Sequence, residues 1–223
     1  MTTNPHLDSA IAFFGAPVDS ADVVVVLLHG RAQSPEYMQR NVAERIDLPG
    51  VAYVAPAAAN GTWYPASFMA ELSENEPMLG FALARVGRLC DGLARDGKPL
   101  AKQVIMGFSQ GACLACEFVR RWRQRFAALI AFTGGLIGPP GTAWTVEGGG
   151  TYGAMPVLLG GSDVDPWVPA ERMSATADWF QRLDARVSLS FFSGMGHLIA
   201  DEQIAEAREI LREVGQRRTH RRG

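Results

Sequence analysis

The stretch VIMGFSQGACLACEFV, residues 104–119, decides the fold. Its first half has the apolar character of a buried strand, which we expect over 100–108. Its second half has the period of a helix, expected over about 110–123. The pentapeptide GFSQG (107–111) stands where the strand turns into the helix. A G-x-S-x-G pattern in that context is typical of a sharp turn that lifts a serine hydroxyl above the carboxyl edge of a sheet, so we predict Ser109 to be a nucleophile.

The rest of the chain alternates short apolar runs with longer amphipathic segments. Strands are expected over 22–29, 51–55, 126–133, 155–160 and 187–192, and helices over about 34–46, 73–97, 169–184 and 201–214. This alternation predicts an α/β fold in which a mostly parallel central sheet carries helices on both faces. The weak pattern before Asp22 is compatible with antiparallel edge strands. The segment 136–154 is expected to be irregular, and no insertion is long enough for a large lid domain.

Length and composition indicate one ordinary globular domain over residues 1–223. The chain is 48% hydrophobic and 20% charged, as expected of such a domain. The net charge of -2 argues against nucleic acid as a partner, and the longest apolar run, 23–28, is too short for stable membrane insertion. The first ten residues do not resemble a signal peptide, and three cysteines are an odd number for a disulfide framework. We therefore expect a cytoplasmic protein.

The C-terminal tail is locally basic. Its arginines are Arg212, Arg217, Arg218, Arg221 and Arg222. An arm that binds nucleic acid or a membrane is the alternative interpretation, but no aromatic residues interleave the arginines as they do in single-strand binders. We expect about 215–223 to be the frayed, solvated end of a helix.

Candidates for an acid and a base follow two later strands. Asp163 and Asp165 both follow the expected strand 155–160, and either could orient a histidine. Among the four histidines, His6 and His220 are assigned to frayed termini, which leaves His29 and His197. His197 follows the strand 187–192, and the chain order serine, aspartate, histidine is that of the α/β-hydrolases. We therefore predict His197 as the general base.

An oxyanion hole requires two N–H donors near the nucleophile. One normally comes from the residue after the serine, which is Gln110, and the other from a loop after an earlier strand. The backbone N–H of Arg31, after the strand 22–29, is the second candidate. We expect His29 to hold that loop by hydrogen bonds.

With these motifs placed, the chain resembles the phospholipase/carboxylesterase family of α/β-hydrolases, which includes bacterial carboxylesterases and acyl-protein thioesterases. The matching stretches are LLHG (27–30), GFSQGA (107–112), GGSDVDPWVP (160–169) and GMGH (194–197). The family's acid is the aspartate of a D-P-x-V-P string, so the resemblance assigns that role to Asp165 over Asp163. It also maps the oxyanion donors onto Arg31 and Gln110, and a tryptophan near the start of the substrate loop onto Trp63.

The loop 60–72 is expected to form a wall of the substrate pocket, because binding sites are apolar clefts with few polar groups. The predicted substrate-binding residues are Trp63, Tyr64, Phe68 and Met195. The alternative is that these aromatic residues only cover the edge of the core. The family commonly has a small glycine-rich stretch after HG, where this chain has Arg31. A guanidinium at the pocket mouth would narrow it or attract an anionic group.

The predicted function is hydrolysis of carboxylic esters with short to medium acyl chains through an acyl-enzyme on Ser109, which needs no metal and no organic cofactor. A thioesterase or lysophospholipase with the same triad is one alternative. A non-catalytic binding or regulatory protein on the same fold is another. The partner is a small-molecule ester, and a homodimer is suggested by the resemblance alone. The C-x-x-C pair Cys113 and Cys116 lies inside a helix and is interpreted as packing rather than redox or zinc chemistry.

Overall fold

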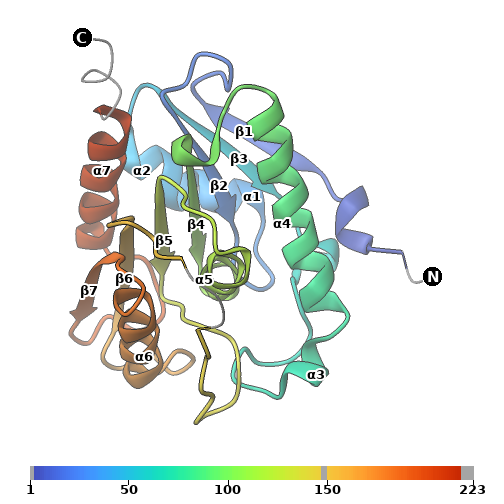
Figure 1. The fold of residues 1–223 in the computed structure, drawn as a ribbon, viewed down its shortest axis with the longest axis vertical. Helices are drawn as coiled ribbons and strands as arrows, with labels where there is room; N and C mark the ends of the chain where they lie inside the picture. The colour runs from blue at the N-terminus through green and yellow to red at the C-terminus, as the bar shows by residue number, and fades with distance from the viewer. Residues whose placement is uncertain (1–2, 147–149, 217–223) are drawn as a thin grey trace.

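A seven-stranded sheet forms the centre of the computed structural model, which describes residues 3–146 and 150–216 (Figure 1). The strand order is β1-β3-β2-β4-β5-β6-β7. Strand β1 pairs antiparallel with β3, and all other pairings are parallel. The strands are β1 (Ile11–Gly15), β2 (Val23–Leu28), β3 (Val51–Pro56), β4 (Gln103–Phe108), β5 (Ala128–Phe132), β6 (Pro156–Ser162) and β7 (Arg186–Phe192). The predicted mostly parallel sheet is confirmed, with its antiparallel edge strand.

Two layers of helices cover the sheet, as predicted. Figure 1 shows α4, α5 and α6 on the face toward the viewer and α2 and α7 behind the sheet. The helices are α1 (Pro35–Met38), α2 (Glu44–Ile46), α3 (Leu72–Asn75), α4 (Met78–Arg95), α5 (Gln110–Trp122), α6 (Ala170–Gln181) and α7 (Asp201–Gln216). None of the helices within the described residues is both long and apolar enough to cross a membrane.

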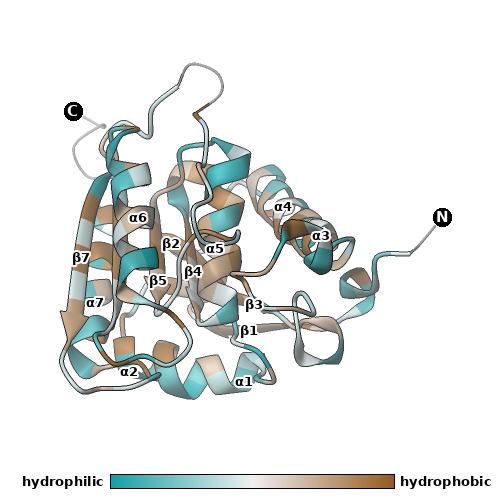
Figure 2. Cartoon of the chain, turned by 90° about the horizontal axis from the view of Figure 1, so that it is seen from below, coloured by the Kyte–Doolittle hydropathy of each residue, from teal (hydrophilic) through white to brown (hydrophobic). Residues whose placement is uncertain are grey.

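The alternation of side chains along the strands builds two hydrophobic cores. In β2, Val24, Val26 and Leu28 join the core under α4, α5 and α6. The intervening Val23, Val25 and Leu27 join the core under α1, α2 and α7. Successive strand residues point to opposite faces, so a continuous apolar run is the pattern of a strand buried on both sides. Figure 2 shows the hydrophobic colouring of these central strands between the helix layers.

The order of the strands sets where a ligand can bind. The chain passes from β2 to β3 on one side and then to β4 on the other side of β2. A parallel sheet opens a crevice at the carboxyl ends of its strands where the strand order reverses in this way. Leu28 and Gly107 are paired at that edge, so the loop after β2 and the turn after β4 lie side by side.

Two predicted helices differ from the observed ones. The segment expected as one helix over 73–97 is divided into α3 and α4 at Pro77, because a proline lacks the N–H that continues a helix. The capping box joins Glu71 and Glu74 instead of beginning at Ser73. The helix expected over 34–46 has a π-helical turn at Gln39–Ala43 between α1 and α2.

The segment 136–154 contains no helix or strand within its described part, 136–146 and 150–154, as predicted. Arg172 of α6 holds its first residues by donating hydrogen bonds to the carbonyl oxygens of Leu136, Gly138 and Pro139, at 2.7, 2.7 and 3.2 Å. At the other end of the chain, α7 continues to Gln216, and the rest of the predicted frayed tail lies outside the described residues.

Candidate active site

Ser109 sits on a strained turn between β4 and α5. Its backbone has φ 55° and ψ -121°, a conformation rare for a residue with a side chain. The turn depends on the flanking glycines. A Cβ atom at Gly107 would lie 2.4 Å from the carbonyl oxygen of Gly111, and one at Gly111 would lie 2.2 Å from that of Leu28. The predicted strand-to-helix turn at GFSQG is therefore present, and it presents the serine above the sheet.

A chain of hydrogen bonds links Ser109 to a histidine and a carboxylate. The Nε2 atom of His197 lies 2.8 Å from the Oγ atom of Ser109. The Nδ1 atom of the same ring lies 2.7 Å from Oδ2 of Asp165. The His197 side chain is 20% exposed and the Asp165 side chain is fully buried. Three residues that follow three different strands thus form one line.

The second oxygen of Asp165 fixes the carboxylate in place. Oδ1 accepts hydrogen bonds from the backbone N–H groups of Trp167 and Val168, at 2.7 and 2.9 Å. Both carboxylate oxygens are therefore used, one by the turn that carries the aspartate and one by the imidazole. A carboxylate held in this way sets the tautomer and the orientation of the ring beside it.

Asp163 has a different position and different partners. Its oxygens accept hydrogen bonds from the backbone N–H of Gly194 and the hydroxyl of Ser193, both at 2.8 Å. These hydrogen bonds lower the pKa of the Asp163 carboxyl below its usual value. Asp163 therefore connects the turn after β6 to the turn after β7 that leads to His197, and it does not contact the ring. The geometry favours Asp165 over Asp163, as the D-P-x-V-P pattern implied.

The loop after β2 packs against the nucleophile. A Cβ atom at Gly30 would lie 3.3 Å from the Cβ of Ser109. The N–H of Gly30 is bound by the side chain of Gln33 at 3.0 Å. Among the described residues, no hydrogen-bond partner is found for the N–H of Arg31 or of Gln110. The two predicted oxyanion donors belong to the two segments that meet at Ser109.

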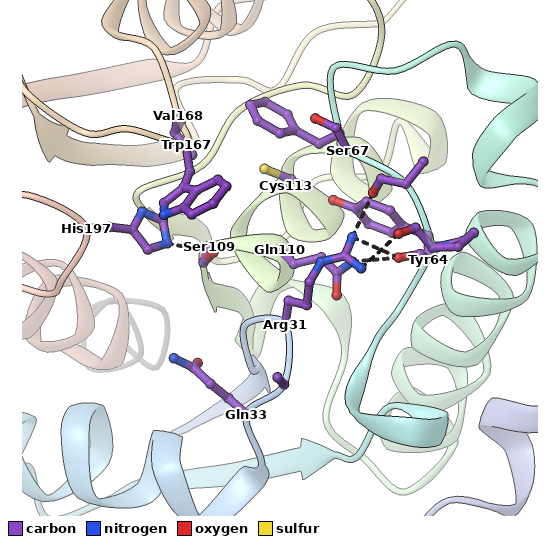
Figure 3. A pocket seen from close by; sticks show the side chains of 14 residues that line it. Arg31, Gln33, Tyr64, Ser67, Ser109, Gln110, Cys113, Trp167, Val168 and His197 are labelled. Atoms are coloured by element: carbon purple, nitrogen blue, oxygen red, sulfur yellow. Dashed lines mark hydrogen bonds between the residues drawn. The ribbon is translucent and has the colours of Figure 1, made fainter.

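A cavity of about 550 Å³ opens beside these groups (Figure 3). Its wall includes Ser109, Gln110 and His197 together with residues of three loops: Arg31, Ala32, Gln33, Tyr64, Pro65, Ala66, Ser67, Phe68, Trp167 and Val168. Cys113 of α5 completes the lining. The predicted pocket residues Tyr64 and Phe68 are therefore at the pocket, and they come from the loop that the sequence indicated.

Two predicted substrate-binding residues do not line this cavity. Trp63 has no exposed surface, because its indole N–H donates to the carbonyl oxygen of His29 at 2.8 Å and its ring packs against His6 and His29. Met195 is half-buried in the turn between β7 and His197, flanked by Gly194 and Gly196 in left-handed conformations. The structure thus places both residues outside the cavity lining. For Trp63, it favours the alternative that the aromatic residue covers the core.

The two buried histidines hold the loop that carries Trp63. The Nδ1–H of His29 donates to the carbonyl oxygen of Gly30 at 2.8 Å, so His29 bonds the loop after β2, as predicted. Its Nε2 atom accepts the N–H of Ala58 at 2.9 Å, which ties that loop to the segment leading to Trp63. His6 was expected in a frayed terminus, but it is fully buried and accepts the N–H of Ala59 at 3.0 Å. Its position follows from Asn4, which caps the short helix Pro5–Asp8.

Trp167 and Val168 line the pocket without a predicted role. Trp167 is 71% exposed at the pocket mouth, and its indole has no ring partner within the described residues. Val168 follows it and is buried. Trp167 and Val168 lie two and three residues after Asp165 in the DPWVP stretch, so their place at the carboxyl edge of the sheet was the available signal. Cys113 was interpreted only as a packing residue. It is a free, buried thiol, like Cys116, and burial raises its pKa to about 12.

Several solved structures are similar to this chain. A phospholipase/carboxylesterase from Dyadobacter fermentans DSM 18053 is 34% identical, with a TM-score of 0.83 over 92% of this chain and 97% of that one. Esterase PE8 is 26% identical, with a TM-score of 0.73 over 92% and 99%. Acyl-protein thioesterase 2 of Zea mays shares the fold at 18% identity, with a TM-score of 0.73 over 93% and 99%. None of the curated protein sequences compared with the chain matches it.

The similarity extends over almost the whole chain. A family model described as phospholipase/carboxylesterase matches residues 10–214, from just before β1 to near the end of α7. The strand order, the helix layers and the turn at Ser109 are those of an α/β-hydrolase fold without a large lid. The chain therefore belongs to the phospholipase/carboxylesterase family of α/β-hydrolases.

Proposed function

We propose that this protein hydrolyses carboxylic esters with short to medium acyl chains through a covalent acyl-enzyme on Ser109. The observation that carries the proposal is the line of hydrogen bonds from Ser109 Oγ through His197 to the buried carboxylate of Asp165. That line lies at the wall of a cavity large enough for a small ester. The family to which the chain belongs supports the same class of reaction.

The first half of the reaction acylates the serine. His197 Nε2 takes the proton of Ser109 as Oγ attacks the ester carbonyl carbon, and the carbonyl oxygen becomes an oxyanion. Asp165 accepts the hydrogen bond from Nδ1–H and stabilises the imidazolium that forms. The N–H groups of Arg31 and Gln110 bind the oxyanion. When the tetrahedral intermediate collapses, His197 protonates the leaving oxygen, and an alcohol departs.

The second half returns the free enzyme. His197, again neutral, removes a proton from a water molecule, and the resulting hydroxide attacks the acyl-enzyme carbonyl. Collapse of this second tetrahedral intermediate breaks the bond to Ser109 Oγ, which takes back a proton from His197. The carboxylic acid then leaves the pocket. Each proton that His197 accepts is returned within the same half-reaction, so the cycle balances without another reactant.

The cavity supports the size of acyl group that we propose. Phe68 and Val168 contribute apolar side chains to a wall that also contains Tyr64. No lid within residues 3–146 and 150–216 extends this wall outward, so an acyl chain beyond medium length would leave much of its surface in water. Burial of apolar surface contributes about 25 cal/mol per Å², so methylene groups outside the cavity add little to binding.

A series of p-nitrophenyl esters from acetate to palmitate tests the proposal. We expect turnover with kcat/KM highest between acetate and octanoate, and none above background in Ser109→Ala. The matched control is Ser20→Ala, because Ser20 is exposed and only bonds the carbonyl of Pro17. Wild-type protein that is folded but hydrolyses none of these esters would contradict the proposal. A preference for palmitate would contradict the chain-length part alone.

A further inference from the structure

The side chain of Arg31 is directed onto the backbone of the pocket loop (Figure 3). Its guanidinium donates hydrogen bonds to the carbonyl oxygens of Tyr64, Pro65 and Ala66, at 3.1, 2.9 and 2.7 Å. A planar guanidinium carries five N–H donors in a fixed fork, so three bonds to successive carbonyls determine its orientation. The guanidinium, which we expected to narrow the pocket mouth or attract an anionic group, is therefore held on the loop backbone, and we call these three hydrogen bonds the Arg31 clamp.

The side chain of Gln110 binds the same loop. Its Nε2 donates to the carbonyl oxygen of Tyr64 at 2.8 Å, and its Oε1 accepts the N–H of Trp63 at 3.0 Å. The hydroxyl of Thr62 also bonds the Gln110 carboxamide. The carbonyl oxygen of Tyr64 thus receives donors from both Arg31 and Gln110. These two residues carry the proposed oxyanion N–H groups.

The loop that joins them is itself firmly held. The indole of Trp63, which belongs to this loop, is fully buried against His6 and His29. Three residues after Trp63, the N–H of Ala66 donates to the buried side chain of Asn75 at 2.8 Å, and Asn75 donates to the carbonyl oxygen of Ser67 at 2.8 Å. Residues 62–66 are therefore held in a fixed position, and the two segments that carry the oxyanion donors are both attached to them.

We propose that the Arg31 guanidinium is a positioning group for the oxyanion hole. By binding the Tyr64 carbonyl that Gln110 also binds, it fixes the backbone N–H of Arg31 relative to that of Gln110. This inference rests on the proposed acyl-enzyme reaction.

Local geometry shows why a clamp is needed on this side. The N–H of Gln110 begins α5, whose hydrogen bonds hold it, whereas the N–H of Arg31 belongs to a short turn. In that turn Ala32 is left-handed, with φ 56°, and its N–H bonds the carbonyl of Gly61 at 2.8 Å. Oxyanion donors act because they are held in place before the charge develops. A turn that fluctuates would present one donor out of position for part of the time.

The test compares two variants that remove different features of the clamp. Arg31→Met keeps most of the side-chain length and loses every side-chain donor, while its backbone N–H remains. Arg31→Lys keeps the charge but loses the planar fork of N–H groups. We expect Arg31→Met to lower kcat by about 10- to 100-fold, less than the 10²–10³ for a lost donor, with KM within about threefold. Arg31→Lys is expected to lie between it and the wild type. Arg88→Met is the matched control, because Arg88 is exposed on α4, and it should leave kcat unchanged.

A second readout reports the oxyanion hole alone. A trifluoromethyl ketone is attacked by the serine and forms a tetrahedral oxyanion. The corresponding alcohol, which has no carbonyl group to attack, only occupies the pocket. We expect the Ki of the ketone to rise in Arg31→Met by the same factor as kcat/KM falls, and the Ki of the alcohol to stay constant. Because Arg31 is exposed, millimolar guanidinium added to Arg31→Ala should restore part of kcat, and sodium at the same ionic strength should not.

The outcomes separate this inference from the proposed function. Wild-type protein without esterase turnover would remove the proposed function itself. Active wild type with Arg31→Met unchanged in kcat and in ketone affinity, while folded by circular dichroism, would overturn the positioning role alone. A change confined to KM for anionic esters would also overturn it, because it would assign Arg31 to substrate binding. If Arg31→Met does not fold, Arg31→Lys and guanidinium rescue of Arg31→Ala decide the question.

Discussion

The carboxylate of Asp165 accepts a hydrogen bond from Nδ1 of His197 at 2.7 Å while its side chain has no exposed surface. Asp163, two residues earlier, is exposed and bonds Gly194 and Ser193 instead. Two aspartates in one short turn thus have separate tasks. One orients the ring, and the other connects the turn to the loop that carries His197.

The two aspartates predict different losses of activity. Asp165→Asn should lower kcat by about 10⁴-fold, because the amide favours the wrong imidazole tautomer and cannot stabilise the imidazolium. Asp163→Asn should lower kcat by less than tenfold, because it weakens only the connection between two turns. Steady-state kinetics on one nitrophenyl ester measures both. Equal losses in the two variants would mean that the assignment of the acid is wrong.

The exposed position of Trp167 predicts that its removal weakens substrate binding. Its indole is 71% exposed at the pocket mouth and would be partly covered by a bound ester. Trp167→Ala should raise KM about 3- to 30-fold and change kcat little, because the same contact exists in the ground state and in the transition state. Phe13→Ala is the control, since Phe13 is 64% exposed on β1 away from the cavity lining. A fall in kcat at constant KM would contradict a role in binding.

The buried histidines predict how stability depends on pH. Burial lowers the pKa of His6 and of His29 below 6.5; nearby Arg85 lowers the first further, and Glu36 opposes the shift of the second. Both rings accept a backbone N–H, so they must stay neutral in the folded protein. Below pH 6.5 the unfolded chain binds protons that the folded chain does not. The free energy of unfolding should therefore have its full value above pH 6.5 and should decrease as the pH is lowered below 6.5.

Denaturant melts between pH 5 and 8 measure this dependence. Each histidine contributes at most about 1.4 kcal/mol per pH unit between 6.5 and its own pKa in the folded protein. His6→Gln should remove the contribution of His6 to the slope of unfolding free energy against pH. It should also lower the unfolding free energy at every pH, because Trp63 and Ala59 lose their hydrogen-bond partner. A slope that is the same in this variant as in the wild type would show that His6 does not titrate with unfolding.

The cysteines predict resistance to thiol reagents. All three are free and buried, and burial raises the pKa of Cys90 and of Cys113 to about 12. The thiolate is the reactive form, so iodoacetamide at pH 8 should leave the esterase activity of the folded protein unchanged. The same reagent should label three cysteines per chain after unfolding. Rapid loss of activity on alkylation of Cys113, which lines the cavity, would contradict this expectation.

The sequence predicted the sheet and the turn at Ser109 because their signals are local. An apolar strand, two glycines and a serine suffice for that turn, and His197 follows a strand in the same way. Position after a strand did not separate Asp165 from Asp163, and only the family's D-P-x-V-P string favoured Asp165. Trp63 could not be placed from the sequence, since its burial depends on His6, which is 57 residues away. The clamp of Arg31 depends likewise on carbonyl groups 33 to 35 residues away. Backbone acceptors leave no trace in a residue pattern.

The central claim is that Ser109 is an activated nucleophile, and one measurement tests it most directly. A fluorophosphonate probe is reacted with the wild type, Ser109→Ala, His197→Ala and the control Ser20→Ala, and the adduct is located by mass spectrometry. We predict one adduct, on Ser109, in the wild type and the control, and none in the other two variants. A folded wild type that is not labelled, or that is labelled at another residue, would contradict the claim.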